Sequence, residues 1–238
     1  MSSIVNYLRQ TIRAVGLAAT LVSTLAAAAE TVEVVPGVQV TKRTYAAPVN
    51  EQPFFGFAAK SSEQKAEDEK FVSAMIGATG SREKAFEEAT KRAWIAIQAG
   101  KVREAALRFN QAFLVSPEQS SVYHGFAVIA QARFSDLDAA DELFKIALKQ
   151  PNPVKALKAD YGRMLLIAKR PRDAQEVLDQ AVKEAPDFSD AWTNLAWARF
   201  QNGDPAAACA AAEEAAKKRP SNNSISDLTA VRSVAQCK

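Results

Sequence analysis

A repeat of about 34 residues constrains this 238-residue chain more than any other feature of its sequence. Three columns of small or apolar residues recur in register. The first column is alanine, the second follows it by four positions and the third by seven. The columns are Ala105, Ala140, Ala174 and Ala208; Phe109, Phe144, Leu178 and Ala212; and Ala112, Ala147, Ala181 and Ala215. These spacings place the three columns on one face of a helix.

Each repeat is expected to form two helices joined by a turn. Alanine in the columns lets two antiparallel helices approach closely, and proline ends the second helix because it cannot continue the hydrogen-bond ladder. Pro117, Pro186 and Pro220 follow the third column by five positions, and Pro151 follows it by four. Since a single hairpin buries only one of its faces, the repeats are expected to stack on one another.

This pattern resembles the tetratricopeptide repeat (TPR), whose period is about 34 residues and whose order is helix, turn, helix and proline. The fourth repeat carries it most clearly, with Trp192 and Leu195 in its first helix and Asn202-Gly203-Asp204 at its turn. The resemblance implies an all-α TPR solenoid of about four helical hairpins. The repeats are expected at about 86–119, 121–154, 155–188 and 189–222.

Two further helices are expected to cap the stack, so that the TPR domain covers residues 61–238. Upstream, residues 61–76 form a charged segment with apolar residues on one side, and Gly77 and Gly80 follow it. Downstream, Ser224 and Asp227 have the spacing of a helix start. Residues 224–237 then carry one apolar face, made by Ile225, Leu228, Val231 and Val234.

The first 29 residues have the order of a secretory signal peptide. Arg9 and Arg13 precede an apolar stretch, and alanines at 26–29 lead to Glu30. An uncleaved membrane anchor is the alternative, but the apolar stretch is shorter than the roughly 20 residues that a spanning helix needs. We therefore expect cleavage after residue 29, no stable membrane span in the mature chain, and a periplasmic or secreted location.

Residues 30–60 show no helical period and are expected to form an extended or flexible arm. Pro36, Pro48 and Pro53 favour extended conformations of the residues before them. The cluster Phe54-Phe55-Gly56-Phe57 either docks on a partner or packs back on the helices. The second interpretation is favoured, because three free phenylalanines would promote aggregation.

Cys209 and Cys237 are the two cysteines of the chain. An even count in a protein that leaves the reducing cytoplasm indicates a disulfide, and two free thiols are the alternative. Cys209 is expected early in the second helix of the fourth repeat, and Cys237 at the end of the antiparallel cap helix. Both would then lie near the same end of a hairpin.

The sequence offers few groups for catalysis or metal binding. His124 is the single histidine, at a position more typical of a packing residue than of a catalyst, and two distant cysteines do not make a zinc site. The net charge of +3 comes from basic residues mixed with acidic ones, without the basic stripe that nucleic acids require. We expect no enzyme activity, no cofactor, no metal and no nucleic-acid partner.

The resemblance also implies a binding surface, because TPR arrays present the first helix of each hairpin on a concave face that binds peptides or a partner helix. Carried onto this chain, the positions are Lys91, Trp94 and Gln98; Ile129 and Arg133; Asp160, Arg163 and Ile167; and Asn194, Trp197 and Gln201. Tryptophan and arginine are enriched at binding hot spots. Packing of Trp94 and Trp197 between helices is an equally open interpretation.

The functional hypothesis is a scaffold or adaptor that holds a protein or peptide partner in the cell envelope through this face. Two alternatives remain open. One is a glycan-binding module that uses Trp94 and Trp197 as stacking platforms, which saturable polysaccharide binding would favour. The other is a carboxylate-based cell-wall hydrolase, which convergent acids in a pocket would favour.

Overall fold

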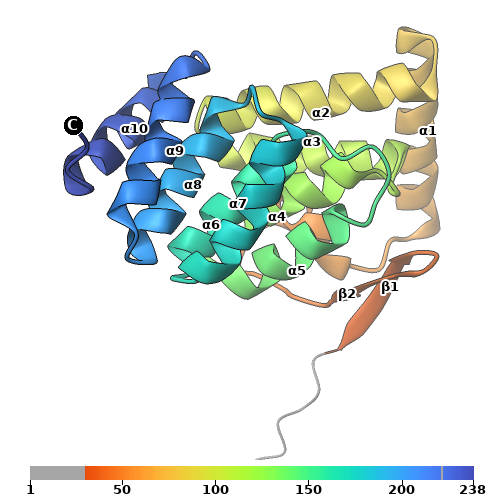
Figure 1. Cartoon of the computed structure of the whole chain (residues 1–238). Coiled ribbons are helices and arrows are strands. Elements are labelled where there is room, and N and C mark those ends of the chain that lie inside the picture. Colours follow the sequence, from red (N-terminus) through yellow and green to blue (C-terminus); the bar gives the residue numbers. More distant parts are fainter. Residues whose placement is uncertain (1–29, 221) are drawn as a thin grey trace, which may run out of the picture.

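The computed structural model describes residues 30–220 and 222–238, and helical hairpins make up most of it (Figure 1). The hairpins are α2 (Arg82–Gln98) with α3 (Val102–Val115), α4 (Ser120–Phe134) with α5 (Leu137–Ala147), α6 (Leu157–Ile167) with α7 (Pro171–Glu184), and α8 (Ser189–Gln201) with α9 (Pro205–Lys217). Helix α1 (Ser62–Thr79) precedes them and α10 (Asn222–Val234) follows. The all-α solenoid of four hairpins is thus confirmed.

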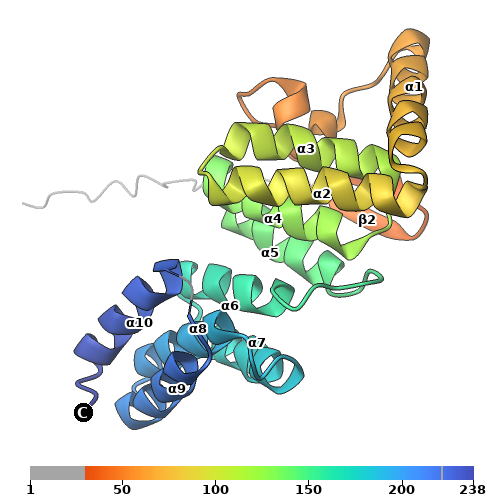
Figure 2. The same cartoon turned by 90° about the horizontal axis from the view of Figure 1, so that it is seen from above.

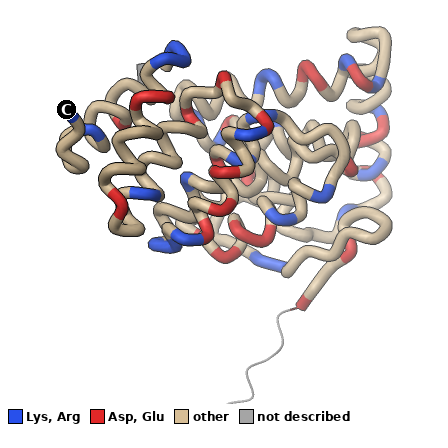
Figure 3. The backbone as a smooth tube through the Cα atoms, in the orientation of Figure 1, with Lys and Arg blue, Asp and Glu red and all other residues tan. Residues whose placement is uncertain are grey.

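The array curves between its second and third hairpins. From above, α2 to α5 lie together, and α6 to α9 continue below them with a changed direction (Figure 2). A longer connection with Pro151 and Pro153 separates α5 from α6, and α6 packs on α5, α7 and α8. Basic and acidic residues are interspersed along the described chain (Figure 3).

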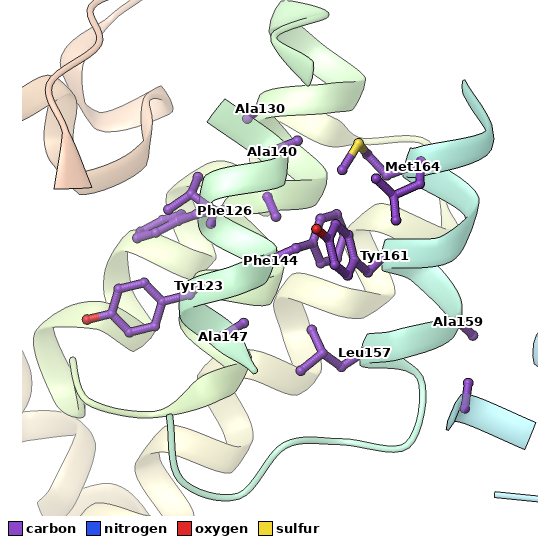
Figure 4. Packing of buried hydrophobic residues seen from close by; sticks show 14 of the residues in the cluster. Tyr123, Phe126, Ala130, Ala140, Phe144, Ala147, Leu157, Ala159, Tyr161 and Met164 are labelled. Carbon is purple, nitrogen blue, oxygen red and sulfur yellow. The ribbon is translucent and has the colours of Figure 1, made fainter. Parts of the chain in front are cut away.

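The column residues meet in the core, and glycine on a facing helix makes room for them. Phe109 of α3 lies so close to Gly125 of α4 that a β-carbon there would come within 2.2 Å of the ring. Gly162 of α6 faces Leu178 in the same way, at 2.4 Å. Between the second and third hairpins, Phe144 and Tyr161 stack with ring centroids 5.2 Å apart (Figure 4). Small residues therefore set how closely neighbouring helices approach.

The two cap helices are unequal. Helix α1 starts with a capping box between Ser61 and Gln64 and ends at Gly80, whose φ is +91°. None of its residues is buried, so it covers the first hairpin only in part. Helix α10, by contrast, buries Leu228 and Val231 against the last hairpin.

Two expected boundaries are shifted. The first hairpin begins at Arg82 rather than near residue 86, because the Ser81 side chain accepts a hydrogen bond from the backbone N–H of Lys84 and caps the helix one turn earlier. Helix α10 covers 222–234 rather than 224–237. The expected signal peptide, residues 1–29, lies outside the described residues.

The expectation of an extended or flexible arm at 30–60 is wrong, because this segment is folded onto the helices. It forms an antiparallel hairpin of β1 (Thr31–Val35) and β2 (Val38–Thr41), then two 3-10 helices, η1 (Val49–Glu51) and η2 (Pro53–Phe57). These elements pack against α3, α4 and α5. We call residues 30–60 the N-terminal segment.

Phe54 holds the N-terminal segment in place. Its side chain is 6% exposed, and its ring centroid lies 4.6 Å from that of Phe126 and 5.4 Å from that of Phe113. The interpretation that the phenylalanine cluster packs back on the helices is therefore confirmed. Residues 54–57 all have φ between +54° and +60°, a left-handed turn that costs about 1–2 kcal/mol for each residue with a β-carbon. Surrounding contacts must hold such a turn in place.

Buried polar contacts complete the attachment. Asn110 of α3 donates from Nδ2 to the carbonyl oxygens of Asn50 (2.9 Å) and Gln52 (2.7 Å), while its Oδ1 accepts from the Phe55 N–H at 3.2 Å. The Glu51 carboxylate is paired with Arg103 at 2.9 Å and with Arg133. Hydrogen bonds from Arg103, with the positive charges of both arginines, lower the pKa of Glu51 below its usual value.

Candidate binding groove

The first helices of the hairpins line a groove on the inner side of the curve, together with α10. Its first part is lined by Trp94, Ile97 and Gln98 of α2, Val128 and Gln131 of α4, Phe144 of α5, Asp160 and Arg163 of α6, Asp190, Thr193 and Asn194 of α8, and Ser224, Ser226 and Asp227. It continues over Leu166, Ile167, Trp197 and Gln201 through the shared residues Arg163, Asn194 and Asp227. We call this continuous surface the groove.

Most of the residues expected on the concave face lie in this groove. The structure brings together Trp94, Gln98, Asp160, Arg163, Ile167, Asn194, Trp197 and Gln201. Lys91 is exposed one turn before Trp94 on α2 but does not line the groove. Whether these residues bind a partner stays a prediction.

Ile129 and Arg133 do not lie in the groove, so their assignment to the concave face is wrong. Ile129 is fully buried in the core, and Arg133 points to the N-terminal segment, where it pairs with Glu51. Helix α4 presents Val128 and Gln131 to the groove instead. Helix α4 is apolar on all sides, a pattern typical of a helix that is covered on more than one face. This pattern in the sequence could have indicated that Ile129 and Arg133 do not face the groove.

The two tryptophans pack on neighbouring rings and also line the groove. Trp94 meets Phe109 edge to face, with centroids 5.2 Å apart, and lies 4.6 Å from the His124 ring. Trp197 meets Phe200 in a similar arrangement at 6.2 Å. Both are half-buried. Each indole is therefore fixed by its own contacts before any partner arrives.

His124 is a buried residue that links two hairpins. Its side chain is 1% exposed, and its Nε2 lies 2.8 Å from Oδ2 of Asp160 on α6. The expectation that His124 is a packing residue agrees with this position. The pairing with Asp160 was not anticipated, although the separation of 36 residues is close to one repeat and so places both residues at similar positions of successive first helices.

Helix α10 contributes to the groove as well as covering the last hairpin. Asp227 is paired with Arg163 of α6 at 2.5 Å, and Ser224 donates a hydrogen bond to Asp190 of α8. These contacts join α10 to the third and fourth hairpins. Sequence reasoning assigned α10 only a capping role and did not identify Ser224, Asp190 or Asp227 as groove residues.

Asn194 is oriented by the backbone of the preceding repeat. Its Nδ2 donates to the carbonyl oxygen of Ala159 at 3.0 Å, and its residue is 5% exposed. Since the carbonyl oxygen must accept from the NH₂ group, this bond fixes which end of the amide is oxygen. Asn194 lines both parts of the groove, at its centre.

A disulfide closes the C-terminal end, as the two cysteines predicted. Cys209 of α9 and Cys237 are joined, with Cα atoms 5.4 Å apart, within the range that such bonds require. The bond fixes the end of α10 to the fourth hairpin. Over the described part of the chain there is no group of His, Cys, Asp and Glu able to hold a metal ion, and none of the described helices is long and apolar enough to cross a membrane.

Comparison with known proteins supports the repeat assignment. A tetratricopeptide-repeat family model matches residues 162–223, which cover the third and fourth repeats. A search of curated proteins found no significant match. The following three similarities concern the fold alone, since the sequence identities are low.

The structure titled as a functional characterisation of Pseudomonas aeruginosa pilF aligns with a TM-score of 0.55 and 21% identity, over 65% of this chain and 71% of that one. A thermophilic TPR protein of Thermus thermophilus aligns with a TM-score of 0.52 and 17% identity, over 71% of this chain and 98% of that one. PilW, described as a type IV pilus biogenesis factor, aligns with a TM-score of 0.51 and 16% identity, over 74% of this chain and 89% of that one.

Proposed function

We propose, since this chain is a tetratricopeptide-repeat protein, that it is an exported adaptor which binds a segment of a protein partner along the groove in the cell envelope. The fold is that of a protein-interaction scaffold. We propose in addition that the chain has an export signal, that it lies in the cell envelope, and that the groove is its binding site. Among the similar solved structures, PilW is described as a type IV pilus biogenesis factor, and the envelope role is our proposal for this chain.

The main support for the proposal is that the side chains lining the groove are held in place before a ligand binds. Its half-buried indoles are held by ring contacts, and its central amide is oriented by the bond from Asn194 to Ala159. A surface whose side chains are ordered beforehand loses less conformational entropy when it binds. This arrangement supports recognition of an extended segment that crosses successive first helices.

The two alternatives receive less support. The groove contains carboxylates, as a hydrolase would need, but Asp160, Asp190 and Asp227 each hold a contact with another helix. For a glycan-binding module, Trp94 already uses ring area for contacts with Phe109 and His124. The carboxylates and the Trp94 ring are thus accounted for by packing between helices, and so we favour the adaptor.

Site-specific photo-crosslinking tests the adaptor function. A benzophenone amino acid is placed at Gln98 or Gln201, which are exposed and line opposite parts of the groove, or at Gln180, which is exposed on the second helix α7. We expect the same partner protein to cross-link from both groove positions in envelope material and not from Gln180. Equal cross-linking from Gln180, or none from the groove, would contradict the proposal.

The location is tested separately through the N-terminus. We expect the isolated protein to begin at Glu30 and to appear in the soluble envelope fraction, because the alanines at 26–29 provide the small residues that a signal peptidase requires. N-terminal sequencing by mass spectrometry measures this directly. A membrane-bound product that retains Met1 would show that the segment acts as an anchor.

A further inference from the structure

We propose that the groove is selective for an extended peptide segment with a lysine or arginine at its centre and apolar residues on either side. This inference rests on the proposed adaptor function and concerns the chemistry of the segment that the groove receives.

The charge of the groove is the first observation. Three carboxylates, those of Asp160, Asp190 and Asp227, line it together with one guanidinium, that of Arg163. Arg163 is already paired with Asp227 at 2.5 Å. Two negative charges therefore remain without a cation among the described lining residues, whereas the whole chain carries a net charge of +3. The negative charge is a local property of this surface, and a cationic partner complements it.

A surplus of hydrogen-bond acceptors is the second, independent observation. The Nδ2 of Asn194 is used by the Ala159 carbonyl, whereas its Oδ1 has no hydrogen-bond partner among the described residues. Because Asn194 lines the groove, this oxygen is free to accept from an N–H group of a ligand. Asp160 and Asp227 each engage one carboxylate oxygen through Oδ2 and keep side-chain exposures of 39% and 35%. A ligand that supplies N–H groups here would satisfy these accessible oxygens.

The ends of the groove are apolar and define the flanking residues of the segment. Trp94, Ile97 and Val128 line one end, and Leu166, Ile167 and Trp197 line the other. Ile167 is 50% exposed and is therefore accessible to an apolar side chain of a partner. Apolar side chains of the partner would cover these ends while its cationic residue lies over the central acids.

The spacing of the first helices of the hairpins determines the length of the bound segment. Neighbouring helices pack about 8–10 Å apart, so three steps from α2 to α8 span roughly 25–30 Å. An extended chain advances about 3.3 Å per residue and crosses this distance with about eight or nine residues. A nonapeptide is therefore a suitable probe.

The experiment measures binding of two labelled nonapeptides by fluorescence polarisation. Each has a leucine near either end and is otherwise uncharged, with capped termini; one has a central arginine and the other a central glutamate. We expect the arginine peptide to bind at least about tenfold more tightly, with an advantage that decreases as salt increases. Equal affinity, or a preference for glutamate, would overturn the inference.

Variants assign the preference to the groove. The double variant Asp160→Asn, Asp227→Asn removes two charges but keeps an oxygen to accept from His124 and Arg163. It should reduce the advantage of the arginine peptide several-fold. The matched control, Asp138→Asn, changes an exposed carboxylate of α5 outside the groove and should leave the advantage unchanged. Circular dichroism verifies that each variant is folded.

The outcomes separate this inference from the adaptor function. If Asn194→Ala weakens both peptides equally and neither is preferred, the groove binds peptides and only the charge selectivity is wrong. If neither peptide binds at millimolar concentration and the groove positions Gln98 and Gln201 give no cross-links, both proposals fail. Binding of a neutral polysaccharide in place of either peptide would likewise overturn the inference.

Discussion

Glu51 of the N-terminal segment is paired with Arg133 at the end of α4, 82 residues further along the chain. Arg103 of α3 approaches the same carboxylate, so one acid connects the segment to the first two hairpins. This contact explains why Arg133 lies away from the groove. It also ties the order of the N-terminal segment to the ionisation of Glu51.

The pairing predicts a loss of stability in acid. Because the arginines lower the pKa of Glu51 from its ordinary value of 4.5, the contribution to stability is fully present above about pH 4.5 and is lost as the pH falls through the lower pKa of the folded state. Thermal unfolding of the wild type and of Glu51→Gln should differ at pH 6, and the difference should shrink below pH 4.5. A constant difference from pH 6 to pH 3 would contradict this assignment.

Phe54 should contribute more to stability than its neighbour Phe55. Phe54→Ala removes a buried ring and should lower the free energy of unfolding by about 3–5 kcal/mol, measured by urea denaturation. It should also expose residues 30–60 to limited proteolysis, since the left-handed turn loses its main anchor. The control is Phe55→Ala, because Phe55 is half-buried with Lys60 Nζ 3.4 Å from its ring centroid. A loss below about 1 kcal/mol is expected there.

Two glycine-to-alanine changes should have opposite signs. In Gly162→Ala the new methyl group meets Leu178 at 2.4 Å, and overpacking of this kind costs about 1–3 kcal/mol. Gly77→Ala in α1 meets nothing within 4 Å and should stabilise the helix by up to about 1 kcal/mol. Shifts of the same sign in the thermal midpoint would show that helix propensity, rather than the approach of α6 to α7, decides the effect.

Removing the disulfide should loosen α10 first. The bond closes a loop across 28 residues, for which chain entropy gives about 3.5 kcal/mol of stabilisation. In Cys209→Ser, Cys237→Ser we expect amide hydrogen exchange to accelerate in α10 before it does in α2 and α3. Thiol titration of the unfolded, unreduced wild type should find no free thiol. Unchanged exchange in α10 would mean that Leu228 and Val231 suffice to hold the helix.

The repeat hairpins and the disulfide could be predicted from the sequence because their determinants are local or periodic. The alanine columns and the prolines that follow them specify each hairpin within one period of the repeat, and stacking of similar units needs no further information. The disulfide was predicted from the even number of cysteines in a chain expected to be exported, and the repeat register placed Cys209 and Cys237 near the same end of a hairpin.

The tertiary structure alone decided where the N-terminal segment lies and which side of α4 it covers. That attachment depends on contacts such as Phe54 with Phe126 and Glu51 with Arg133, which are distant in sequence and carry no period. The same holds for the groove, whose acids come from α6, α8 and α10 and meet only because the array curves there. A period specifies neighbours along the stack, whereas the curvature and the covering segment depend on how individual side chains pack.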